Sequence, residues 1–99
     1  MSNKKECDFQ SSVINEIYDR IPGVSVTKQD ANYMQGIPDL LVIKDSKWAM
    51  LECKKSSKAS HQPNQDFYVD KFNKMSFASF IYPENRKEVL NGLQKLFES

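Results

Sequence analysis

The sequence predicts an α/β fold of three layers, with a central mixed β-sheet flanked by helices. Apolar side chains recur at helical spacing near the start, in the middle and at the end of the chain, and β-prone segments lie between them. The resulting order is helix, three strands, helix, strand, helix, which is typical of a layered α/β domain. A chain of 99 residues has room for one compact core, so we expect residues 1–99 to form a single domain.

The first predicted elements are a helix and a short strand. Residues 5–21 carry an apolar side chain at every fourth position, which favours an amphipathic helix, and Pro22 and Gly23 end it. Residues 24–28 are β-prone and alternate, so we predict a strand there, followed by a polar loop over residues 29–36. The helical stripe consists of Phe9, Val13, Ile17 and Ile21.

A β-hairpin is predicted next. Residues 37–43 form an apolar run of strand length, residues 44–46 are a turn, and residues 47–54 return as the second strand. Alternation along the second strand sends Ala49, Leu51 and Cys53 into the core. The opposite face then holds Trp48, Met50, Glu52 and Lys54.

The last three elements are a helix, a strand and a helix. We predict a helix over residues 64–75, with aromatic side chains on neighbouring turns, and a strand over residues 76–82 that is buried on both faces. Pro83 opens the final helix. Its apolar face consists of Val89, Leu90, Leu93, Leu96 and Phe97.

Composition excludes several classes of protein. The chain is 39% hydrophobic and 27% charged with 3 Gly and 4 Pro, which is neither a disordered nor a fibrous profile. No apolar run approaches the ~20 residues that cross a bilayer, and no apolar signal region follows the N-terminus. We therefore expect a cytoplasmic protein of a bacterial or phage-infected cell, without a membrane partner. Cys7 and Cys53 belong to no metal or disulfide pattern, so we expect reduced thiols.

Two carboxylates on the predicted hairpin stand out. Asp39 interrupts an apolar strand, and a lone buried carboxylate costs several kcal/mol unless it is paired or binds a metal. Glu52 and Lys54 share one face of the partner strand. We expect Asp39 and Glu52, with the backbone carbonyl of Cys53, to hold Mg²⁺ or Mn²⁺, and Lys54 to orient water or stabilise negative charge. The plainer alternatives are a turn aspartate after Pro38 and a surface cross-strand pair.

The same residues resemble a known family signature. Pro38-Asp39, twelve intervening residues and Glu52-Cys53-Lys54 are similar to the PD-(D/E)XK motif of nucleases, among which the Holliday-junction resolvases, phage endonuclease I and the small VRR-NUC nucleases are the most similar groups. The resemblance implies a restriction-endonuclease-like fold. It also implies that Glu16 supplies an additional metal ligand or catalytic contact. The stretch from Ser60 to Gln65 resembles the fourth motif of the family, which gives Gln65 a catalytic role.

Nucleic-acid contacts are expected beside this centre. Five lysines against two acidic residues lie between positions 44 and 58, and such a run positions phosphates without reading sequence. We expect DNA contacts from Lys55, Ser57 and Lys58, from the loop residue His61, and from Lys28 at the end of the first strand. A solvated charged face is the simpler explanation of the lysine run.

The predicted function is therefore metal-assisted hydrolysis of phosphodiester bonds in DNA by a magnesium- or manganese-dependent endonuclease. The family resemblance favours Holliday junctions or other branched DNA as substrate and a homodimer as the active form, since two-fold symmetry places two centres on opposite strands. The alternatives are a nuclease of phage or defence origin that cuts duplex or single strands, and a catalytically silent module that binds DNA or protein.

Overall fold

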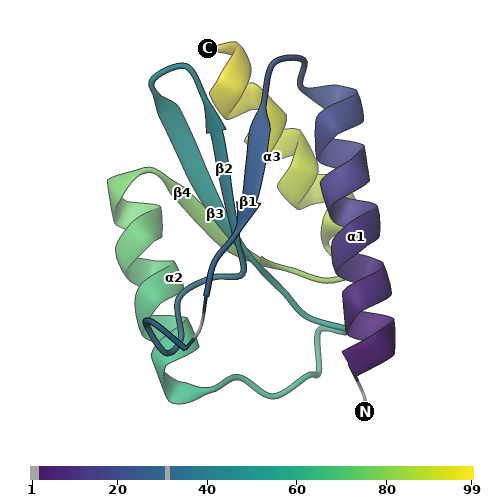
Figure 1. The fold of residues 1–99 in the computed structure, drawn as a ribbon, viewed down its shortest axis with the longest axis vertical. Helices are drawn as coiled ribbons and strands as arrows, with labels where there is room; N and C mark the ends of the chain where they lie inside the picture. Colours follow the sequence, from purple (N-terminus) through teal and green to yellow (C-terminus); the bar gives the residue numbers. More distant parts are fainter. Residues whose placement is uncertain (1–2, 31) are drawn as a thin grey trace.

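A computed structural model describes residues 3–30 and 32–99 of the chain, and the element order is the predicted one. Figure 1 shows three layers: α2 on one side of the sheet, and α1 and α3 on the other. The elements are α1 (Asn3–Arg20), β1 (Ser25–Lys28), β2 (Leu40–Lys44), β3 (Lys47–Cys53), α2 (Pro63–Met75), β4 (Phe77–Ile81) and α3 (Arg86–Glu98).

The sheet is mixed, as predicted. Its four strands lie in the order β1-β2-β3-β4. The β1–β2 and β2–β3 pairs are antiparallel, whereas β4 runs parallel to β3, because α2 carries the chain back across the sheet between them. The hairpin register places Leu40 opposite Leu51. The two ends of the predicted signature therefore lie next to each other, where β2 begins and β3 ends.

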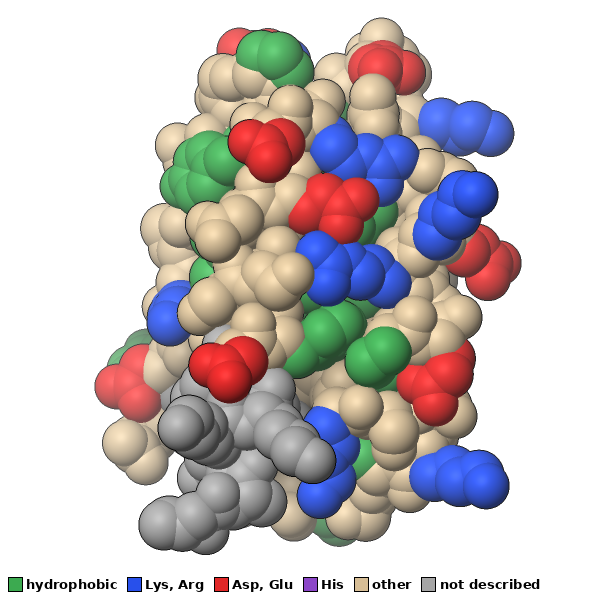
Figure 2. All heavy atoms as spheres, turned by 90° about the vertical axis from the view of Figure 1, so that its right-hand side faces the viewer, with side chains coloured by type: hydrophobic (Ala, Val, Ile, Leu, Met, Phe, Trp, Pro, Cys, Tyr) green, Lys and Arg blue, Asp and Glu red, His purple; other side chains and the backbone are tan. Residues whose placement is uncertain are grey.

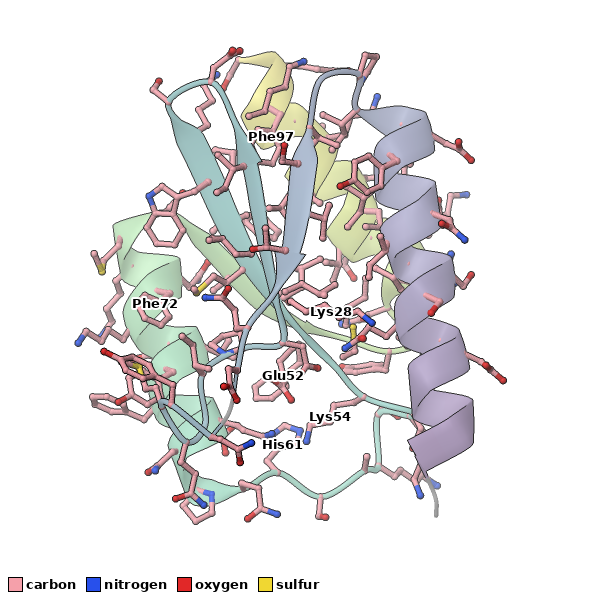
Figure 3. All side chains as sticks on the ribbon, in the orientation of Figure 1. Lys28, Glu52, Lys54, His61, Phe72 and Phe97 are labelled. Carbon is pink, nitrogen blue, oxygen red and sulfur yellow. The ribbon has the colours of Figure 1, made fainter. Side chains whose placement is uncertain are left out.

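The main core lies between the sheet and the layer formed by α1 and α3. Ala49, Leu51 and Cys53 are fully buried there, which confirms the predicted inward face of β3. The helices contribute the apolar positions expected from their spacing, including Phe97 at the end of α3 (Figure 3). The helical members of this core are Val13, Ile17, Val89, Leu90, Leu93 and Phe97.

The opposite face of the sheet packs on α2 less completely. Trp48 meets Phe72 of α2 edge to face, with 6.1 Å between ring centroids, and Met50 is buried. The helix itself has no fully buried residue. One end of this layer is consequently open enough to hold polar side chains, and Glu52 and Lys54 lie at that end (Figure 3).

Two element boundaries and one burial pattern differ from the prediction. β2 begins at Leu40, so Asp39 precedes the strand instead of interrupting it. Pro38 has no N–H to donate, and the N–H of Asp39 donates to a side chain, Glu52 Oε1, at 3.1 Å. α3 begins at Arg86, because residues 83–85 form a turn in which Asn85 Oδ1 accepts from the Tyr82 N–H at 2.9 Å. β4 is an edge strand with several half-buried residues, so the prediction of burial on both faces was wrong.

The structure bears in part on two further expectations, that the cysteines are reduced and that no segment crosses a membrane. The side chain of Cys53 is fully buried, whereas that of Cys7 lies outside the part of the chain that the structure describes. Within the described residues, none of the helices combines the length and the apolar character needed to cross a membrane.

Candidate active site

Asp39 and Glu52 meet where β2 begins and β3 ends. The Asp39 N–H donates to Glu52 Oε1 at 3.1 Å, and Asp39 Oδ2 accepts from the Cys53 N–H at 2.9 Å. The antiparallel register that pairs Leu40 with Leu51 brings these neighbours together. The structure therefore places the two predicted carboxylates side by side, each bonded to the backbone of the other strand.

Glu52 and Lys54 are the buried charged residues among those described, at 4% and 6% exposed. Burying a charged group is unfavourable unless other groups pair with it or hydrogen-bond to it. Lys54 Nζ donates to Gln65 Oε1 at 2.7 Å and to the carbonyl of Ser60 at 3.2 Å. Glu52 Oε2 accepts from Gln65 Nε2 at 2.9 Å. Both charges are therefore held by the same amide.

Gln65 is fixed by its place in α2. It is the third residue of the helix, and its Oε1 also accepts from the Gln62 N–H at 2.9 Å, forming a capping box. A helix cap therefore sets the rotamer of the side chain that links Glu52 to Lys54. This arrangement joins the fourth candidate to the three of the hairpin signature.

A loop that includes residues 32–39 is closed at its base by Asp39, whose carbonyl accepts from the Gln29 N–H at 2.7 Å. Gly36 holds the loop against α2. Its φ is +93°, and a Cβ there would lie 2.3 Å from the Cβ of Asn64. Only glycine combines this backbone conformation with so close an approach. The position of Asp39 thus depends on contacts of the loop with the first turn of α2.

The donor set fits a hard divalent cation. Asp39 and Glu52 supply carboxylate oxygens, and Mg²⁺ commonly takes one or two protein carboxylates and keeps several waters. In an extended strand the N–H and C=O of one residue point to the same side. The carbonyl of Cys53 therefore points toward Asp39, as its N–H does. Among the described residues, no three His, Cys, Asp or Glu side chains converge on one point, so the ion would rely on two carboxylates, this carbonyl and water.

Glu16 does not join this cluster. Its Oε1 accepts from Arg86 Nε at 2.8 Å, and its Oε2 accepts from Arg20 at 3.4 Å. The carboxylate thus links α1 to α3 on the far side of the sheet from α2. A residue at the edge of the apolar stripe of α1 can point toward the candidate site or away from it. Nothing in the sequence indicated that Arg86, 70 positions later, would be the partner of Glu16.

The expected DNA contacts are distributed around the site. Lys55 and Lys58 are exposed on the segment that follows β3. Ser57 is on the same segment, but its N–H and hydroxyl donate to the two oxygens of Glu84 at 3.1 and 3.2 Å. Lys28 ends β1 opposite Leu40. Since Leu40 faces the main core, Lys28 leaves the sheet on the other face from Glu52 (Figure 3).

His61 lies beside the cluster and has two partners. Its Nδ1 is 2.9 Å from Asp66 Oδ1, and its ring stacks on that of Phe80. Asp66 and Phe80 were not among the residues predicted to form the site. The sequence offers one weak signal for Asp66, which is a carboxylate in the first turn of a predicted helix, and none that separates Phe80 from the core aromatics.

Comparison with known proteins supports the fold. No protein-family model matches the sequence, and no curated protein matches it. A solved structure described as a VRR_NUC domain superposes with a TM-score of 0.70, covers 88% of this chain and 95% of its own, and shares 22% sequence identity. At that identity the likeness shows the fold. The chain therefore has the restriction-endonuclease-like architecture that the hairpin signature implied.

Proposed function

We propose that the protein is a metal-dependent endonuclease that hydrolyses phosphodiester bonds in DNA. The observation that carries the proposal is the cluster of Asp39, Glu52, Lys54 and Gln65, in which two carboxylates and a buried ammonium share one connected network. Two carboxylates repel a phosphodiester unless a cation lies between them. A binding module would gain nothing from this arrangement.

Each side chain has a part in such a reaction. Asp39 and Glu52 would hold Mg²⁺ or Mn²⁺ together with the Cys53 carbonyl, and the bound ion supplies an acidified water and neutralises phosphate charge. Lys54 donates to the developing negative charge on the phosphate, from a position that excludes bulk water. Gln65 contacts both Glu52 and Lys54 and orients their side chains. Glu16 would have to leave Arg20 and Arg86 to act as a supplementary ligand, so the proposal does not depend on it.

For the substrate we propose branched DNA, such as a four-way junction, bound through phosphates. Figure 2 shows that the face of α1 and α3 carries acidic and basic side chains side by side. Such a mixed face attracts phosphates weakly. Lys55 and Lys58 instead lie on the segment next to the active site. Cutting of duplex or single-stranded DNA is the nearest alternative. The cleavage assay described below distinguishes these substrates from branched DNA.

We also propose that two copies act together, because one centre cuts one strand. Side chains cap outward N–H groups on both edge strands: the Val26 N–H of β1 donates to the Tyr18 hydroxyl at 3.0 Å, and the Ala78 N–H of β4 donates to Asn73 Oδ1 at 3.1 Å. Such caps oppose strand-to-strand pairing between copies. The contact is therefore expected on a helical face such as that of α1.

The test is a cleavage assay on junction, flap, duplex and single-stranded DNA, each with Mg²⁺, Mn²⁺ or EDTA, resolved on a denaturing gel. Asp39→Asn, Glu52→Gln and Lys54→Ala should each lower cleavage by at least about a hundredfold. DNA binding should be retained or improved in the two carboxylate variants. Lys58→Ala serves as the control, since it should weaken binding and reduce its salt dependence without changing the chemistry. Binding without cleavage in every metal condition would instead identify a silent nuclease-fold module.

A further inference from the structure

The only histidine of the chain is held in a defined orientation by two contacts that the proposed hydrolysis does not use. His61 Nδ1 lies 2.9 Å from Asp66 Oδ1. Its ring stacks on Phe80 with 4.1 Å between centroids and 19° between planes. A histidine on a loop before a helix would otherwise sample several rotamers at an entropic cost to any ligand. The imidazole is therefore preorganised, although its side chain is still 31% exposed.

The same contacts place His61 against the active site. Phe80 is the register partner of Glu52 in the parallel β3–β4 pair, and partners in a sheet project from the same face. The preceding residue, Ser60, supplies the carbonyl that accepts from Lys54 Nζ at 3.2 Å. Figure 3 shows His61, Lys54 and Glu52 at one end of the sheet. A phosphate held at Lys54 would therefore have His61 as a neighbour.

The second ring nitrogen of His61, Nε2, makes no hydrogen bond to the described side chains. An ionised carboxylate can only accept a hydrogen bond, so the contact with Asp66 assigns a proton to Nδ1. The described residues give Nε2 no hydrogen-bond partner, since the contacts of the ring are those with Asp66 and Phe80. Nε2 is thus the nitrogen that a ligand would meet.

The choice of ligand follows from charge. A shared metal ion is disfavoured, because His61 does not converge with two other His, Cys, Asp or Glu side chains in the described part of the chain. The ammonium of Lys54 attracts an anion to this end of the sheet, and a hydrogen bond from Nε2–H to a phosphate oxygen would be charge-assisted and strong. We propose that His61 is a phosphate-binding residue whose Nε2–H donates to the phosphodiester next to the one attacked, with Asp66 as its positioning residue. This inference rests on the proposed function only in that the ligand is DNA.

Because the chain has one histidine, NMR reads the interaction without ambiguity. We would label the imidazole nitrogens of the Glu52→Gln chain with ¹⁵N and add a short DNA duplex in EDTA, which prevents the proposed hydrolysis. The expected result is a change of the Nε2 resonance toward that of a protonated donor, with a smaller change at Nδ1. An Nε2 resonance that stays unchanged while backbone signals of Lys54 and Lys55 shift would overturn the inference.

A matched pair of variants separates a phosphate contact from a packing role. His61→Phe keeps an aromatic ring to stack on Phe80 but has no nitrogen, whereas His61→Ala removes both. Loss of one charge-assisted hydrogen bond should raise the Kd for DNA by about tenfold or more in both variants, and should lower the salt slope by about one. Asp66→Asn should give a smaller increase. If His61→Phe binds DNA as the wild type does while His61→Ala does not, the histidine acts by packing and the inference is wrong.

These outcomes are independent of the outcome for catalysis. Wild-type protein that cuts DNA while His61→Phe retains its affinity would contradict the inference and leave the proposed function intact. Wild-type protein that binds DNA but never cuts it would contradict the proposed function, and the Nε2 resonance would still decide the role of His61. Protein that binds no DNA would contradict both.

Discussion

The amide of Gln65 contacts both buried charges of the candidate site. It donates to Glu52 and accepts from Lys54, at 2.9 and 2.7 Å, so one side chain helps to orient both charged groups. The capping box in turn fixes the position of the glutamine.

Gln65→Ala should therefore lower cleavage while DNA affinity stays close to that of the wild type. Without the amide, Glu52 and Lys54 each lose a hydrogen-bond partner that orients them, and loss of such a positioning contact typically costs about ten- to a hundredfold. Measured kcat with Mn²⁺ on the best substrate checks this. The control is Gln35→Ala, which truncates an exposed glutamine and should cleave normally. Wild-type kcat in Gln65→Ala would mean that the network orients nothing.

Individual site residues were predictable to different extents. Asp39, Glu52 and Lys54 were visible because a hairpin with period-two alternation fixes which side chains share a face. Glu16 was expected at the site from the family resemblance. A helix position near the edge of an apolar stripe, however, does not fix whether its side chain points toward the site or away from it. His61 was expected to contact DNA, yet its partners Asp66 and Phe80 come from α2 and β4, and sequence spacing does not reveal how these elements meet.

At the scale of elements, the loop before β2 and the first turn of α2 support each other. Asn64 Nδ2 donates to the Gln35 carbonyl at 3.5 Å, and Gly36 lies directly against Asn64. The sequence predicted a loop over residues 29–36, but not this contact, because glycine in a polar stretch is compatible with many turns. The contact matters because the loop ends at Asp39 and the helix begins two residues before Gln65. Displacing one element therefore moves groups of the other.

Two glycine substitutions measure this coupling. Gly36→Ala combines a φ of +93° with a Cβ only 2.3 Å from Asn64 Cβ and 2.8 Å from its backbone carbonyl carbon. Gly23→Ala has a similar φ of +84°, but its Cβ would meet only Lys44 Cε, at an ordinary contact distance of 3.6 Å. Both should lose roughly 1–2 kcal/mol of unfolding free energy for the left-handed conformation, and Gly36→Ala should lose more.

Urea denaturation gives the two free energies of unfolding, and only Gly36→Ala should also lower cleavage per folded molecule. Equal losses of stability in the two variants would show that the loop moves away from α2 at little cost. Normal cleavage by a destabilised Gly36→Ala would show that Asp39 keeps its place without the contact.

The link between α1 and α3 is a second element-scale feature. Arg86 donates to Glu16 Oε1 at 2.8 Å and to the Ser12 carbonyl at 3.1 Å. Glu16→Gln should lower the free energy of unfolding by about 1 kcal/mol, because a partly exposed ion pair contributes little, and cleavage should persist. Thermal unfolding together with the cleavage assay checks both. Abolished cleavage in a folded Glu16→Gln chain would restore the metal-ligand role expected from the family resemblance.

At the scale of the whole molecule, most of the fold was predictable. Helical periodicity, the hairpin and the element order gave the three-layer architecture and the mixed sheet. The position of β4 at an edge was not predictable, because a short apolar run has the same pattern at an edge as at the centre. A net charge of +1 likewise gives no preferred face for DNA. The fold places the exposed lysines of the β3–α2 segment beside the candidate active site, because that segment follows Lys54 directly.

Metal binding should be visible in the stability of the whole molecule, without reference to activity. Asp39 and Glu52 converge only in the folded chain, where the β2–β3 register sets them side by side. An ion that binds the folded form alone stabilises it by about 2.7 kcal/mol at a hundred times its Kd. For a chain of this size that corresponds to a rise of roughly 10–20 °C in Tm. Calorimetry with increasing Mn²⁺ should show this rise in the wild type, and little or none in Asp39→Asn and Glu52→Gln. Equal metal-induced shifts in all three proteins would place the ion elsewhere and remove the basis for a metal-dependent reaction at these carboxylates.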